Sequence, residues 1–131
     1  MGHINLEVKD TDLLWHDLNA MIVFLLLKKQ LGAVDCSSDA KLWEQWRWDL
    51  EGAGLLIFTK ALENVPFRER FLAAIDGSIA TLNQFGDFIP KDYLTGLDDI
   101  WNTKFAKDID AGKVNKCLVD LKSAIVANYL T

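Results

Sequence analysis

The stretch AMIVFLLL, residues 20–27, is an unbroken apolar run, and it decides the fold class. A helix that crosses a membrane needs about 20 consecutive apolar residues, so this run is too short to be a membrane anchor. A helix that is apolar on every side is covered on every side by other elements. The run therefore predicts a buried core helix that other helices surround.

Helical spacing of apolar residues continues on both sides of this run, and it predicts five helices bounded by capping residues, glycine and proline. Their expected ranges are about 10–31, 39–63, 65–85, 97–109 and 113–129. Only HINLEV, residues 3–8, hints at strand alternation, and residues 1–9 are expected to form an irregular N-terminal segment. The sequence thus predicts an all-α fold in which residues 1–131 make one domain, a bundle or orthogonal array of about five helices.

The composition limits the classes of partner. The chain has 131 residues, half of them hydrophobic and a quarter charged, which suits one globular domain. Its formal net charge is −5, from 14 basic and 19 acidic residues. Binding to nucleic acids or to an anionic membrane surface depends on Lys and Arg, so we expect neither. The charge is compatible with a basic protein partner, although many acidic proteins have no such partner.

The cellular compartment can be judged from the cysteines and from the start of the chain. The sequence has two isolated cysteines, Cys36 and Cys117, and begins with the polar stretch MGHINLEVKD. The cysteines lack the spacing of a metal site, and we expect two free thiols, with a disulfide between them as the alternative. The start of the chain has no apolar core and no cleavage site of a signal peptide. A cytoplasmic protein is expected.

Residue patterns that carry catalysis or bind a metal are missing from the sequence. The histidines are His3 and His16, and neither HExxH nor ExxH occurs. The phosphate-binding glycine motifs and the GxSxG nucleophile motif are missing as well. We therefore expect no enzyme activity, no metal and no cofactor.

The stretch KLWEQWRWDLEGAG, residues 41–54, holds three tryptophans on its expected helix. Trp43 and Trp46 fall on the same side as Leu50 and Ile57, which predicts core positions. Trp48 falls on the opposite side with Leu55 and Leu62, between Glu44 and Glu51 at helical spacing. One interpretation is that another helix covers this second side. The other is that Trp48, Glu44 and Glu51 anchor a basic protein surface.

A second acidic patch is expected near the C-terminal third, at Asp87, Asp92, Asp98 and Asp99. Solvated helix faces explain such residues equally well.

The chain resembles the small cytoplasmic immunity proteins of bacteria, including those of contact-dependent growth inhibition. It is similar to them in size, in acidity and in its lack of catalytic motifs, and the stretch LWEQWRWDLE at residues 42–51 is the most suggestive part. The resemblance implies a non-catalytic inhibitor whose acidic surface covers a basic toxin domain, often a nuclease. Three alternatives remain open. They are a phage-encoded inhibitor of a host defence complex, a small-ligand-binding bundle with a cavity lined by Trp15 and Trp101, and a subunit that homo-oligomerises through Trp48, Leu55 and Leu62.

Overall fold

The structure is a computed structural model that describes residues 2–32, 37–98 and 100–130. It has a mixed α/β fold, so the all-α prediction of a five-helix bundle or orthogonal array is wrong. In chain order the elements are β1 (His3–Val8), β2 (Thr11–His16), α1 (Asp17–Gly32), α2 (Ser37–Trp48), the π-helix η1 (Asp49–Ala53), β3 (Leu55–Ile57), α3 (Thr59–Leu62), α4 (Val65–Asn83), β4 (Phe88–Ile89), α5 (Lys91–Leu97), β5 (Ile109–Asp110) and α6 (Ala111–Tyr129).

A three-stranded sheet occupies the start of the chain, in the strand order β2-β1-β3. β1 and β2 form an antiparallel hairpin, and β3 pairs with β1 in parallel. The hairpin turns at Lys9, which has a positive φ of 55°. Residues 3–8 are thus a regular strand, and the prediction of an irregular segment there is wrong.

The two faces of the sheet differ because side chains alternate along a strand. Ile4, Leu6 and Val8 of β1 point into the core. On the other face Asn5 lies opposite Leu14, whose side chain is 68% exposed. One face of the sheet therefore covers the core, and the other is open to solvent.

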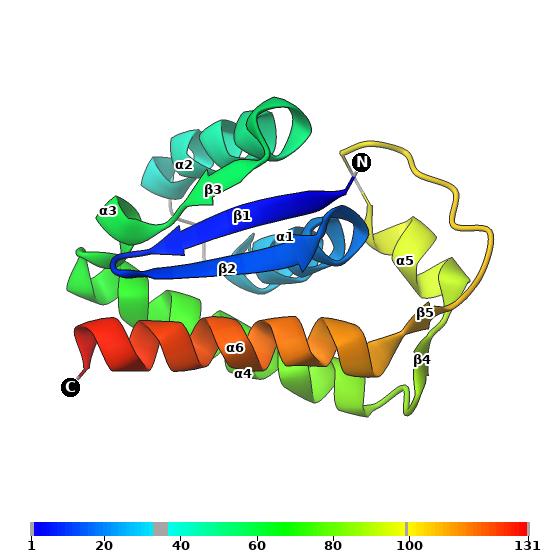
Figure 1. Cartoon of the computed structure of the whole chain (residues 1–131). Coiled ribbons are helices and arrows are strands. Elements are labelled where there is room, and N and C mark those ends of the chain that lie inside the picture. The colour runs from blue at the N-terminus through cyan, green and yellow to red at the C-terminus, as the bar shows by residue number, and fades with distance from the viewer. Residues whose placement is uncertain (1, 33–36, 99, 131) are drawn as a thin grey trace.

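Two long helices, α1 and α6, pack on the buried face of the sheet, and a third, α4, packs against these two (Figure 1). α1 and α6 contact β1 and β2. α2 lies beside β3, at the edge of the sheet (Figure 1). A second, two-stranded sheet of β4 and β5 joins the far ends of α4 and α6.

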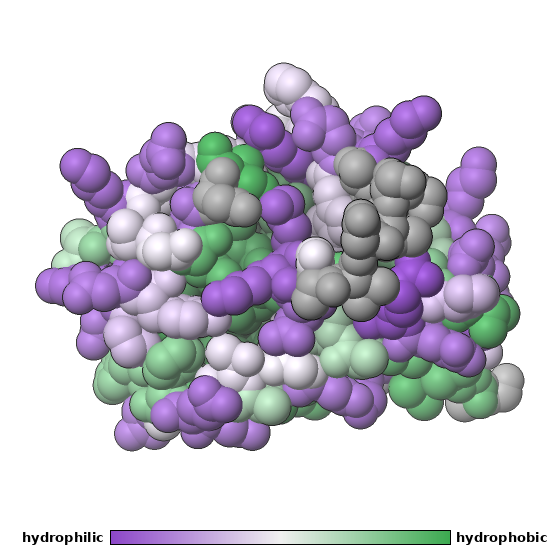
Figure 2. Space-filling view, turned by 180° about the vertical axis from the view of Figure 1, so that it is seen from behind, coloured by the Kyte–Doolittle hydropathy of each residue, from purple (hydrophilic) through white to green (hydrophobic). Residues whose placement is uncertain are grey.

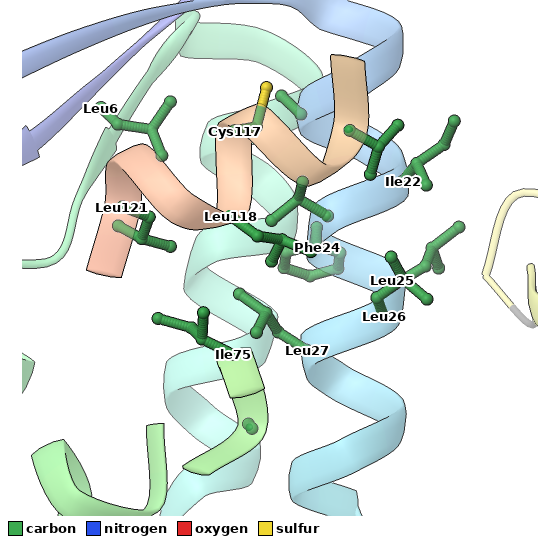
Figure 3. Packing of buried hydrophobic residues seen from close by; sticks show 14 of the residues in the cluster. Leu6, Ile22, Phe24, Leu25, Leu26, Leu27, Ile75, Cys117, Leu118 and Leu121 are labelled. Atoms are coloured by element: carbon green, nitrogen blue, oxygen red, sulfur yellow. The ribbon is translucent and has the colours of Figure 1, made fainter. Parts of the chain in front are cut away.

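The apolar run of residues 20–27 lies at the centre of the core, as predicted. Figure 3 shows Ile22 and Leu25–Leu27 of α1 beside Leu118 and Leu121 of α6. The helix begins at Asp17 rather than near residue 10, because residues 11–16 form β2. The third and fifth predicted helices are confirmed as α4 and α6.

Two other predicted helices are wrong. The helix expected over 39–63 ends in η1, where Gly54 takes the left-handed conformation (φ 66°) and leads directly into β3. Glycine adopts this conformation without the steric cost that other residues meet. Instead of a helix over 97–109, the short α5 comes earlier, and the described residues 100–108 contain no helix.

No helix in the described part of the chain has the length and apolar character that crossing a bilayer requires. The face opposite to the view of Figure 1 is mostly hydrophilic, and its hydrophobic areas are separated from one another (Figure 2).

Candidate protein-binding surface

α2 directs its tryptophans to opposite sides. Trp46 is buried, and its ring centroid lies 4.7 Å from that of Phe58. Trp43 packs edge-on against Phe24, with 5.2 Å between the ring centroids. The indole N–H of Trp46 donates to the backbone carbonyl of Ile57 at 3.2 Å. The predicted core positions of Trp43 and Trp46 are confirmed.

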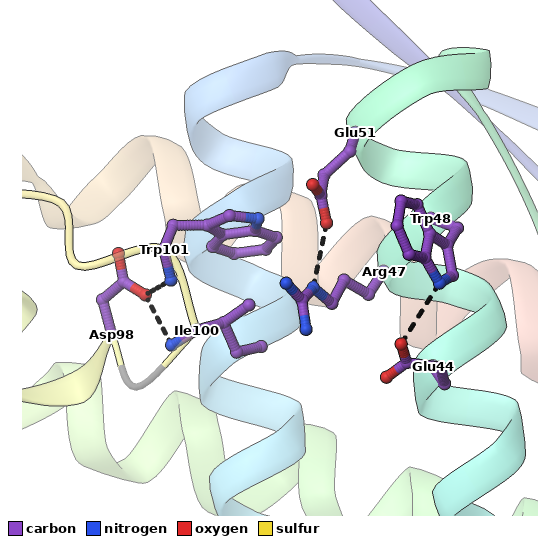
Figure 4. Close-up of polar contacts among 7 residues, drawn as sticks. All are labelled: Glu44, Arg47, Trp48, Glu51, Asp98, Ile100 and Trp101. Carbon is purple, nitrogen blue, oxygen red and sulfur yellow. Dashed lines mark hydrogen bonds and ion pairs between the residues drawn. The ribbon is translucent and has the colours of Figure 1, made fainter.

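Trp48 lies on the outside of α2, and its side chain is 60% exposed. Its indole N–H donates to Oε1 of Glu44 one turn earlier, at 3.1 Å (Figure 4). The interpretation that another helix covers Trp48 is therefore wrong. Leu55 and Leu62 do not continue its surface, because Leu55 belongs to β3 and Leu62 is fully buried in α3. The exposed stripe expected of a homo-oligomer is thus not present on this helix.

Glu51 lies on η1, one turn beyond Arg47. The guanidinium Nε of Arg47 is 2.9 Å from Oε2 of Glu51, and about a third of each side chain is exposed. Such exposed pairs at i, i+4 contribute only about 0.3–0.5 kcal/mol. The pair therefore partly neutralises Glu51 and leaves it accessible to a second cation.

The predicted second patch does not form one surface. Asp87 and Asp92 are exposed, whereas Asp98 is 5% exposed. Asp99 lies outside the described residues. The expected patch is therefore divided.

Asp98 organises the segment that follows α5. One carboxylate oxygen accepts the N–H groups of Ile100 (3.0 Å) and Trp101 (2.8 Å), and the other accepts the N–H of Thr103 (3.0 Å). Burial alone raises the pKa of the Asp98 carboxyl, but these N–H groups and the Thr103 hydroxyl stabilise the carboxylate and hold its pKa below the ordinary value. The ionised side chain thereby fixes the position of Trp101.

Trp101 faces η1 across a pocket of about 340 Å³. Figure 4 shows the Trp101 ring in front of α1, on the side from which the Arg47–Glu51 pair faces it. The pocket is lined by Asp17, Leu18, Met21, Leu50, Glu51, Trp101 and Thr103. This pocket could not be recognised in the sequence, because its residues come from three segments that only the fold brings together. Asp17 in particular falls inside the helix expected over residues 10–31, where an acidic residue is ordinary on a solvated face.

A larger groove of about 800 Å³ lies on the other side of α2. Its apolar walls include Trp46, Ile57 and Phe67, and Lys60 and Arg70 are among its polar residues. By contrast, the internal space that Trp15 borders measures only about 10 Å³. That space has about the volume of one water molecule, so it is too small for a ligand.

Groups that would carry chemistry are few among the described residues, and none of their His, Cys, Asp and Glu clusters could hold a metal ion. Cys117 is buried on α6, and burial, followed by the nearby Asp120, raises the pKa of its thiol to about 11. A thiol with so high a pKa is a poor nucleophile at neutral pH. Cys36 lies outside the described residues.

Comparison with known proteins provides no relative: neither a protein-family model, nor a curated protein, nor a solved structure matches the chain. The geometry of the surface around Trp48 is therefore the basis for assigning a function.

Proposed function

We propose that this protein is a non-catalytic inhibitor that binds a basic protein domain, as a bacterial immunity protein neutralises its toxin. The observation that carries the proposal is the exposed indole of Trp48, hydrogen-bonded to Glu44. Tryptophan is enriched among the residues that dominate binding energy at protein interfaces. An indole already held in one orientation loses less conformational freedom when a partner binds.

The charge of the chain supports a basic partner. Glu44 is exposed beside Trp48, and the formal net charge of −5 attracts a positively charged domain over a distance of about a Debye length. A toxin that acts on nucleic acid is basic for its own function, so a nuclease domain fits this surface. The proposal places the inhibitor in the cytoplasm, where such a toxin would act. A phage-encoded inhibitor of a host defence complex would need the same surface, and the identity of the partner separates the two.

The test is affinity capture of the tagged protein from its source cells at low and high salt, with mass spectrometry of what remains bound. We expect one basic protein in near-stoichiometric amount. Trp48→Ala, Glu44→Lys and Glu51→Lys should each reduce its recovery while the melting temperature changes little, because these side chains are at least one-third exposed.

Matched controls come from other exposed positions. Leu14→Ala removes a similarly exposed apolar side chain from the open face of the sheet, and Glu69→Lys reverses an exposed charge on α4. Both controls should retain the partner. Loss of the partner in the controls but not in Trp48→Ala would place the interface elsewhere. Recovery of no stoichiometric protein at either salt would refute the proposal.

A second candidate function, binding of a small apolar ligand, is favoured by the groove of about 800 Å³ beside Trp46. Its volume lies within the range of small-molecule sites, about 300–1,000 Å³. A ligand there would raise the melting temperature by mass action and change tryptophan emission. A thermal-shift screen of apolar compounds tests it, and Ile57→Asp at the groove wall is the variant that should abolish any shift.

A further inference from the structure

The pocket between η1 and Trp101 combines two carboxylates, one indole and an apolar floor. Asp17 and Glu51 supply the carboxylates, and Leu18, Met21 and Leu50 supply aliphatic surface. Its volume of about 340 Å³ is at the low end for ligand sites and suits one extended side chain. We propose that this pocket receives an arginine side chain of the partner protein. The inference rests on the proposed function and specifies which residue type the partner contributes.

Both carboxylates keep free acceptor capacity. An ionised carboxylate has about four lone-pair sites. One oxygen of Asp17 accepts the Gly2 N–H at 3.2 Å, and the other lies 3.2 Å from Nδ1 of His16. Each oxygen of Asp17 therefore has room for a further donor, and among the described residues Glu51 is bonded only to Arg47.

The indole of Trp101 favours arginine over lysine. Its ring is half-buried, and its centroid lies 5.8 Å from that of Phe24, which supports it from the core side. A guanidinium is planar, is weakly hydrated and stacks on an aromatic face, whereas an ammonium is compact and strongly hydrated. A planar cation that stacks on the Trp101 ring can donate to the carboxylates of Asp17 and Glu51, which line the same pocket.

The protein's own Arg47 provides a precedent at the rim of this pocket. Its guanidinium already binds Glu51 at 2.9 Å and points toward Trp101 (Figure 4). Arg47 would therefore compete with an incoming arginine for Glu51. Removing the Arg47 charge should strengthen binding, and removing the charge of Glu51 or Asp17 should weaken it. Such opposite effects are not expected from general loss of structure.

The experiment is an NMR titration of the isotope-labelled protein with N-acetyl-arginine amide, and with the neutral isostere N-acetyl-citrulline amide. The Trp101 indole N–H signal, assigned with Trp101→Phe, reports on the pocket. We expect the arginine compound to shift this signal saturably and the citrulline compound to leave it unchanged. Asp17→Asn and Glu51→Gln should each weaken binding about fivefold, and Arg47→Gln should strengthen it by a similar factor.

Glu69→Gln, an exposed carboxylate on α4, is the matched control and should bind as the wild type does. No shift with the arginine compound, or equal shifts with both compounds, would overturn the inference. So would unchanged binding in both Asp17→Asn and Glu51→Gln. Because the titration uses no partner protein, it can fail while Trp48→Ala still loses the captured partner. That result would contradict the arginine-binding pocket but not the proposed function.

Discussion

The indole N–H of Trp46 donates to the backbone carbonyl of Ile57 across 3.2 Å, joining α2 to the edge of the sheet. Phe58 directly follows β3, and its backbone N–H donates to the backbone carbonyl of Glu7 in β1. The Ile57 carbonyl belongs to the same peptide group and points the opposite way, away from β1. An edge strand exposes such unpaired groups, which can template pairing with other chains. Trp46 therefore closes part of this edge in addition to filling the core.

Trp46→Phe should lower the free energy of unfolding by about 2 kcal/mol, because it leaves the Ile57 carbonyl without its donor and reduces core volume. Trp48→Phe, two residues away and exposed, should change stability by less than about 0.5 kcal/mol. Urea denaturation followed by circular dichroism measures both. Equal effects of the two substitutions would mean that the burial difference between the two indoles does not determine stability.

Asp98→Ala should destabilise the protein by about 2 kcal/mol at neutral pH, since three backbone N–H groups lose an ionised acceptor. The pKa of Asp98 is lowered in the folded state, so its contribution is present above the unfolded pKa and is lost as pH falls through the folded pKa. The difference between wild type and variant should therefore shrink below about pH 4. Urea unfolding at neutral and acidic pH tests this, and a difference independent of pH would contradict it.

Cys117 should resist alkylation in the folded state. With a pKa of about 11, about one thiol in a thousand is ionised at pH 8, compared with about a quarter for an ordinary cysteine. In a Cys36→Ser background, iodoacetamide should modify the folded protein at least about 100-fold more slowly than the protein in urea. Similar rates in both conditions would show that the thiol is neither buried nor shifted.

Gly54→Ala and Gly52→Ala should have opposite effects. Gly54 has a φ of 66°, and an added Cβ would have space, with the His3 carbonyl oxygen 4.0 Å away. The cost therefore comes from the left-handed backbone and should be about 1 kcal/mol. Gly52 lies in η1 with an ordinary φ and open space, so alanine there should stabilise by about 0.5–1 kcal/mol. Thermal unfolding of the two variants checks the signs.

The long amphipathic and fully apolar helices could be predicted from the sequence. The apolar spacing of α4 and α6 and the proline at the start of α4 agree with the structure. Helical spacing also predicted that Trp46 and Trp48 lie on opposite sides of their helix, because both residues belong to α2. Where local pattern and tertiary packing agree, periodicity alone is sufficient.

The sheet could not be predicted because its signals are weak or overlap with helical ones. Leu13, Leu14 and Trp15 of β2 continue into α1 as one apolar pattern, and the hairpin turns at Lys9 without the usual Asn-Gly or Asp-Gly pair. β3 has three residues, too few for alternation to be recognised. Asp98 accepts the N–H groups of residues that follow it, as the side chain of an N-cap residue does. No helix follows, however, and Asn102 takes a positive φ of 52°.

The parallel pairing of β1 with β3 has a consequence for the order of folding. The β1–β2 hairpin is local, whereas pairing of Asn5 with Leu55 closes a loop of about 50 residues. The entropy of that closure is lost before the contacts it allows are gained, so β3 should join after the hairpin has docked on α1. η1, which carries Glu51, leads directly into β3, so the Glu51–Trp101 pocket is completed in this late step. Partially folded chains should therefore lack this pocket, and only molecules that have finished folding should receive an arginine side chain there.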